Sequence, residues 1–126
     1  MKYAFALCLF SMIAHFAQAD MDCEFAYTKT SRFEFTAAFT PDGRIAGNIA
    51  MHFTDDNGFS SFGTFPAVSS IIAPGQFVNF SSVGDDGFDF SVDASYEPTT
   101  RRYRGFLRTT DHETQRPISL AGSCSL

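Results

Sequence analysis

The chain has 126 residues, which is enough for one domain. Its formal net charge is −5, and this acidic balance argues against nucleic-acid binding, which normally requires a basic surface. After the first residues, no stretch is apolar enough to span a membrane as a helix.

Residues 1–19 are predicted to be a secretory signal peptide. Lys2 supplies a short positive region, residues 3–16 are largely apolar, and residues 17–19 read Ala-Gln-Ala, a typical cleavage site. The apolar run is shorter than the ~20 residues that a membrane-spanning helix needs. We therefore expect an exported protein, periplasmic or extracellular, in which residues 20–126 form a single β domain.

Two cysteines remain in that domain, Cys23 and Cys124, one near each end. In an exported protein a single pair of cysteines favours a structural disulfide. Closing so long a loop stabilises a fold by about 4 to 5 kcal/mol in the chain-entropy model. The alternative is a reactive thiol pair, but the C-x-x-C spacing typical of that class is absent.

The first half of the domain predicts four strands, because apolar residues alternate with polar ones over residues 23–27, 33–39, 45–53 and 59–65. Residues 41–43 read Pro-Asp-Gly, which is typical of a three-residue hairpin loop. Pairing Thr40 with Arg44 across this loop places Phe35 opposite Ile49, on the face that also includes Gly47.

Residues 66–75 are harder to interpret and fit either a short edge strand or a loop over the end of a barrel. Further strands are predicted at residues 76–82, 88–96, 102–108 and 118–124. Val78 and Phe80 are expected to face inward.

The clearest pattern is the hairpin formed by residues 88–109. Pairing Tyr96 with Arg101 places Asp93 opposite Arg104, and it satisfies both the apolar and the charged face. The same register places Asp89 opposite Arg108.

These eight strands predict an all-β fold, a small antiparallel up-and-down barrel or barrel-like sandwich closed by one disulfide. In such a ring the first and last strands are antiparallel neighbours, so Cys23 and Cys124 meet. Closure also removes the exposed edges that a phenylalanine-rich sheet must avoid. An eight-stranded interior is just wide enough for side chains to fill, so we expect a packed core.

Alternate loops of a meander lie at the same end, which groups residues 29–32, 54–58, 83–87 and 110–117. This rim collects more acidic than basic residues, with Asp55, Asp56, Asp85, Asp86, Asp111 and Glu113 against Lys29, Arg32 and Arg116. Clustered carboxylates suit a basic protein partner or a Ca²⁺ ion. The alternative is that Asp-Asp-Asn-Gly and Asp-Asp-Gly are simply good turn sequences. No loop matches the EF-hand pattern of calcium ligands.

The remaining candidates are weaker. His52 and His112 lack the spacing of a zinc site and are expected at the surface. No catalytic motif is present, so we predict neither an enzyme nor a metal or cofactor requirement. Phe62, Phe77 and Phe106 face outward, and Phe106, flanked by arginines, is the best candidate for a surface anchor in a protein complex.

Together these observations predict an exported, non-catalytic binding module, an inhibitor or protein-binding domain that uses the acidic rim. One alternative is a small carrier of apolar ligands, and another is a structural envelope protein. The sequence does not determine the partner or the oligomeric state. Nor does it determine the glycosylation of Asn79, which begins an Asn-Phe-Ser sequon and is expected to face outward.

Overall fold

The computed structural model describes residues 19–83, 89–111 and 114–126. The expected signal peptide lies outside these residues except for Ala19. The described residues form antiparallel strands, with no helix able to cross a membrane. The strands are β1 (Ala19–Ala26), β2 (Arg32–Phe39), β3 (Ile45–Thr54), β4 (Ser60–Pro66), β5 (Ser69–Ala73), β6 (Phe77–Val83), β7 (Asp89–Glu97), β8 (Arg102–Thr110) and β9 (Pro117–Ser125).

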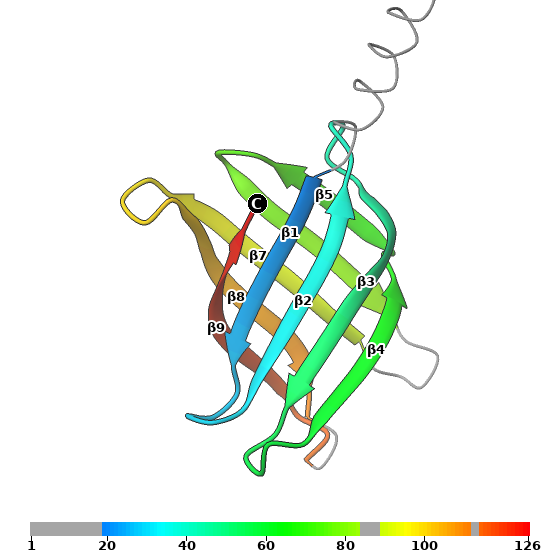
Figure 1. Ribbon diagram of the computed structural model, residues 1–126, viewed down its shortest axis with the longest axis vertical. Coiled ribbons are helices and arrows are strands. Elements are labelled where there is room, and N and C mark those ends of the chain that lie inside the picture. The colour runs from blue at the N-terminus through cyan, green and yellow to red at the C-terminus, as the bar shows by residue number, and fades with distance from the viewer. Residues whose placement is uncertain (1–18, 84–88, 112–113) are drawn as a thin grey trace, which may run out of the picture.

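All nine strands belong to one sheet in the order β4-β3-β2-β1-β9-β8-β7-β6-β5. In Figure 1, β1 to β4 form a front layer, and β6 to β8 cross behind it in another direction. The first and last strands pair in the middle of the sheet, whereas its two edges, β4 and β5, are consecutive in the chain. The fold is therefore a curled half-barrel. The all-β prediction is confirmed. The prediction of a closed barrel is wrong, because β4 and β5 do not pair with each other.

The ninth strand arises between the two edges of the sheet, β4 and β5, where the chain continues without reversing its direction. Each paired neighbour is antiparallel, including β1 and β9, so β4 and β5 must run in the same direction. Only Ala67 and Val68 separate them. Residues 60–73 are thus one extended segment that bends from one layer to the other, as strands do at the corners of crossed sheets. The predicted count of eight was wrong because the segment pairs on both sides of this bend.

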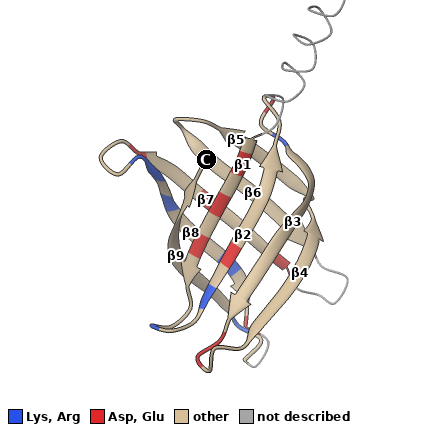
Figure 2. Cartoon of the chain, viewed as in Figure 1, with Lys and Arg blue, Asp and Glu red and all other residues tan. Residues whose placement is uncertain are grey.

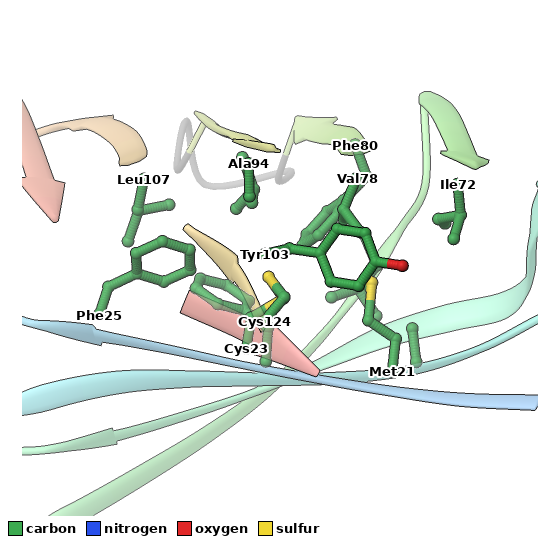
Figure 3. Packing of buried hydrophobic residues seen from close by; sticks show 14 of the residues in the cluster. Met21, Cys23, Phe25, Ile72, Val78, Phe80, Ala94, Tyr103, Leu107 and Cys124 are labelled. Atoms are coloured by element: carbon green, nitrogen blue, oxygen red, sulfur yellow. A yellow bond between two sulfur atoms is a disulfide. The ribbon is translucent and has the colours of Figure 1, made fainter. Parts of the chain in front are cut away.

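The predicted disulfide is present. Cys23 lies directly opposite Cys124 in the β1–β9 ladder, with 3.9 Å between their Cα atoms, and the two sulfurs are bonded. Both residues are buried in the core, where Figure 3 shows them between the two layers.

The β2–β3 turn forms as predicted. The Thr40 N–H donates to the Arg44 carbonyl at 2.9 Å, and Gly43 adopts a φ of 82°, which glycine reaches without strain. Phe39 and Ile45 then face each other in the predicted register.

Farther from that turn the register changes by two residues, and Phe35 lies opposite Met51 rather than Ile49. The change coincides with an irregularity between Thr36 and Ala38, where Gly47 on the opposing strand has a φ of 82° and is exposed. One residue of β2 at this point stands opposite three residues of β3, and two extra residues at such a bulge produce the shift. The prediction that Gly47 faces inward was therefore wrong.

The β7–β8 hairpin also differs from its predicted register by two residues. Tyr96 lies opposite Tyr103, and Asp93 lies opposite Phe106. The cause is the turn, in which the Arg101 N–H donates to the Glu97 carbonyl at 2.9 Å while Arg101 adopts a φ of 58°. An even shift leaves every side chain on its predicted face.

The shift changes the charged partners, however. Arg108 pairs with Asp93 at 3.3 Å rather than with Asp89, and Arg104 pairs with Glu97 at 3.6 Å.

Aromatic rings fill the space between the two layers. The ring of Phe35, on β2, lies 6.1 Å from that of Phe25, 6.2 Å from Phe80 and 4.8 Å from Phe90. Val78 and Phe80 are buried, as predicted, and Figure 3 shows them opposite β1. The centre of the half-barrel is thus occupied by side chains from both layers.

Candidate functional site

Three loops lie together at the lower end of the molecule in Figure 1. They are residues 27–31 after β1, residues 55–59 after β3, and residues 111 and 114–116 after β8. We call this surface the acidic loop end. It brings Asp55, Asp56 and Asp111 to one end, as the meander predicted. Asp85, Asp86, His112 and Glu113 lie outside the described residues.

Asp56 connects two of these loops. Its Oδ1 accepts hydrogen bonds from the hydroxyls of Thr28 and Thr30, each at 2.5 Å. These bonds stabilise the charged form, and they lower the pKa of the Asp56 carboxyl below its usual value. The β1–β2 and β3–β4 loops are consequently held in contact by an ionised side chain.

Asp55 stabilises its own loop. Its Oδ1 accepts hydrogen bonds from the backbone N–H groups of Asn57 and Phe59, both at 2.9 Å. Aspartate commonly stabilises turns in this way. For this residue, the alternative that Asp-Asp-Asn-Gly serves as turn sequence is therefore supported.

Asp111 connects the third loop to the first. The Tyr27 hydroxyl donates to its Oδ2 at 3.2 Å, and the Thr114 N–H lies 3.5 Å from its Oδ1. Nearby, Arg32 makes ion pairs with Glu24 at 3.3 Å and with Glu34 at 2.8 Å. The loop end is thus cross-linked by side chains that keep their negative charges at the surface.

The described residues contain no group of three or more His, Cys, Asp or Glu side chains that could hold a metal ion. Asp55 and Asp56 each already use one carboxylate oxygen as a double hydrogen-bond acceptor.

His52 lies on the outer face of β3, as predicted. Its ring stacks on Phe62 of β4, with 4.4 Å between centroids and an angle of 3° between planes. Its Nε2 atom is buried and has no hydrogen-bond partner among the residues that the structure describes. His52 is thus a packing partner of an exposed ring.

Phe106 also faces outward, with 47% of its surface exposed, and it lies opposite Asp93. It borders a shallow hollow of about 400 Å³ that also touches Phe77 and Arg104. The flanking arginines already pair with Asp93 and Glu97. Phe106, the predicted anchor, is therefore accessible, and the positive charges of the arginines beside it are partly neutralised by ion pairs.

One feature of this surface was missed from the sequence. Asp20, Asp22 and Glu24 alternate with buried residues of β1, and Glu24 faces Glu34 of β2. Figure 2 shows acidic segments along both strands on the front face. The period-2 pattern of residues 20–25 was sufficient to predict this stripe, which extends the acidic surface beyond the loops.

Comparisons of the chain with protein-family models, with curated proteins and with solved structures found no match. Its function must therefore be inferred from its own geometry.

Proposed function

We propose that this protein is an exported, non-catalytic binding module whose acidic loop end docks a basic protein partner, as an inhibitor or a protein-binding domain does. The observation that supports this proposal is the cross-linking of three loops by Asp56 and Asp111. Loops that are held in place before binding lose little conformational freedom when a partner docks.

The electrostatics favour a basic partner. The loop end presents Asp55, Asp56 and Asp111 against Lys29 and Arg116. The stripe on β1 and β2 adds further carboxylates along the front face, so acidic side chains outnumber basic ones. Negative surfaces of this kind accelerate association with positively charged proteins and help to select them.

The alternatives have less support. A carrier of apolar ligands needs an internal cavity, but Phe35 is in contact with rings from both layers. A structural envelope protein needs no preorganised loops. Neither the sequence motifs nor the described geometry offers a nucleophile with its base, so we rank an enzyme below both of these alternatives.

The test is the affinity of the oxidised domain for a Lys-rich peptide, measured by calorimetry at increasing salt. The variant Asp55→Asn/Asp56→Asn/Asp111→Asn removes three charges. At Asp55 and Asp56 the remaining amide oxygen can still accept both loop hydrogen bonds, whereas at Asp111 an NH₂ group replaces one of the two accepting oxygens. The matched control, Asp42→Asn/Asp93→Asn/Glu97→Gln, removes the same charge away from the loop end and from the acidic stripe on β1 and β2.

We expect the loop-end variant to lose at least tenfold in affinity and the control to lose less than twofold. We also expect wild-type binding to weaken steeply with salt. Equal losses in the two variants would mean that only net charge matters, and would refute a site at the loop end.

A further inference from the structure

One part of the sheet differs in character from the rest. No charged residue or histidine lies between Asp56 and Asp85, a stretch that includes the whole of β4, β5 and β6. Figure 2 shows these strands without acidic or basic segments. Six of the nine exposed large apolar side chains of the described residues lie in this stretch: Phe59, Phe62, Val68, Ile71, Phe77 and Val83.

This uncharged region contains both edges of the sheet, and the β5 edge is covered. The Ile72 N–H donates to the Gly43 carbonyl at 2.8 Å, and the Ile45 N–H donates to Ser70 Oγ at 2.9 Å. The β2–β3 turn and the first residue of β3 therefore lie against β5, where they engage the Ile72 N–H and the Ser70 hydroxyl.

The β4 edge is open. The Asp55 N–H donates to the Phe59 carbonyl at 2.9 Å, and this bond shows which residues of β4 direct their backbone groups toward β3. In an antiparallel pair every second residue directs its N–H and C=O away from the neighbour. In β4 these residues are Ser60, Phe62 and Thr64.

The far end of β4 is consistent with this alternation. Pro66 belongs to the same set, and its carbonyl accepts a hydrogen bond from Ser82 Oγ at 2.5 Å, on the side away from β3. Within the described part of the chain, the backbone groups of Ser60, Phe62 and Thr64 have no partner beyond β4.

Edge strands in soluble proteins are usually protected by a charged side chain, a bulge or a covering loop. The open part of β4 has no charge, and its pairing with β3 is regular. Its central side chain, Phe62, is 81% exposed, and its ring stacks on His52 of the neighbouring strand. Such an edge is suited to an added strand.

We propose that β4 pairs antiparallel with β4 of a second copy of this chain, around a two-fold axis at Phe62. In this register Phe62 faces Phe62 of the partner subunit, and Ser60 faces Thr64 of the partner subunit. All the open N–H and C=O groups of the edge then pair, because an isologous interface matches one patch with itself.

The charge distribution favours a second copy as the occupant. Each chain has a net charge of −5, so two copies repel each other across most of their surfaces. The uncharged edge is where they approach without this repulsion, whereas a basic partner is attracted to the acidic loop end. A single short strand pair buries less area than a standard interface of about 1,200–2,000 Å², so the dimer is weak and concentration-dependent.

Sedimentation velocity of the oxidised chain over a concentration series tests this proposal. Phe62→Lys places two positive charges opposite each other at the axis. The matched control is Phe59→Lys, because Phe59 is 74% exposed and lies just outside β4. A second variant, Thr64→Pro, removes one edge N–H that β3 does not use.

We expect the wild type and Phe59→Lys to shift from monomer to dimer with the same midpoint. Phe62→Lys and Thr64→Pro should stay monomeric at tenfold higher concentration, with unchanged circular dichroism. A wild type that is monomeric throughout would overturn the proposal. So would equal weakening by the two lysine variants, or binding of the wild type to neutral phosphatidylcholine vesicles in place of dimerisation. Binding of the Lys-rich peptide by Phe62→Lys should be unchanged, which separates this test from that of the proposed function.

Discussion

The sheet is closed by strand pairing at the β1–β9 junction and open at the β4–β5 junction. At the β1–β9 junction the two strands come from opposite ends of the chain, yet they pair from Asp22 to Phe25 and are joined by a disulfide. At the β4–β5 junction only Ala67 and Val68 intervene, yet the two strands do not pair. Proximity in the chain therefore does not decide where a sheet closes.

The side chains explain this difference. In β1, every second residue from Met21 to Phe25 is buried, so one face is fixed toward the core along the whole junction. In β4, no residue is fully buried, and exposed residues occur on both faces. A strand with one strongly apolar face specifies its position, whereas a strand without such a face does so weakly.

The largest effect is expected from the closed junction. Cys23→Ser/Cys124→Ser should lower the free energy of unfolding by about 2–5 kcal/mol, because the unfolded chain is no longer constrained by a long loop. Urea unfolding measures the change. Reduction of the wild type should produce the same loss and should not affect the double variant. A loss below ~1 kcal/mol would show that the ladder alone holds the junction.

The next test compares a glycine at the β1–β9 junction, Gly122, with a glycine in β4, Gly63. A Cβ at Gly122 would lie 2.1 Å from the Glu24 carbonyl oxygen, so Gly122→Ala must force β9 away from β1. At Gly63 in β4, the nearest atom is a ring carbon of Phe65 at 3.0 Å, which can move.

We expect Gly122→Ala to cost about 1–3 kcal/mol or more, as overpacking does, and Gly63→Ala to cost less. Thermal unfolding of both variants measures the difference. Similar costs would mean that the two junctions are equally tight.

A smaller effect is expected at the covered β5 edge. Ser70→Ala removes the acceptor of the partly buried Ile45 N–H, which should cost about 1 kcal/mol and accelerate exchange of that amide. Ser69→Ala is the matched control, because Ser69 is exposed and neighbours Ser70 on the same strand. If both variants unfold alike, the contact between the β2–β3 turn and β5 does not stabilise the fold.

The smallest effect concerns the pH dependence of the loop end. Thr28 and Thr30 lower the pKa of Asp56 in the folded state, relative to an ordinary value of 3.8. Their stabilising effect is therefore present above that value and is lost as the pH falls through the lowered pKa.

The unfolding midpoints of the wild type and Asp56→Asn should differ at pH 6, and this difference should shrink as the pH falls through the lowered pKa of Asp56. Thr30→Ala should reduce this difference. A constant difference at all pH values would contradict the contribution of the carboxylate charge.

Much of the fold was predictable because alternation is a strong local signal. It identified Val78 and Phe80 as inward-facing and placed Cys23 beside Cys124, although it failed at the bulge that contains Gly47. Registers were less predictable because they depend on turn conformations. Arg101 adopts a positive φ without being glycine, and this lengthens the β7–β8 turn relative to the predicted one.

The bend between β4 and β5 and the side-chain contacts of the loop end were not predictable from the sequence pattern. Residues 66–73 gave no clear period because the segment changes layers, so the direction of the core changes along it. The meander correctly grouped Asp55, Asp56 and Asp111 at one end. The bonds from Thr28 and Thr30 were not predictable, because they join loops whose side-chain conformations no periodic pattern fixes.

Amide hydrogen exchange, followed by NMR at a concentration where the chain is monomeric, tests the central claim most directly. β1 has a neighbour on both sides, so we expect uniform protection from Asp22 to Phe25. In β4 we expect alternation, with fast exchange at Ser60, Phe62 and Thr64 and protection at Ser61, Gly63 and Phe65. Uniform protection along β4, or alternation along β1, would contradict a sheet that is closed where the chain ends meet and open where the chain is continuous.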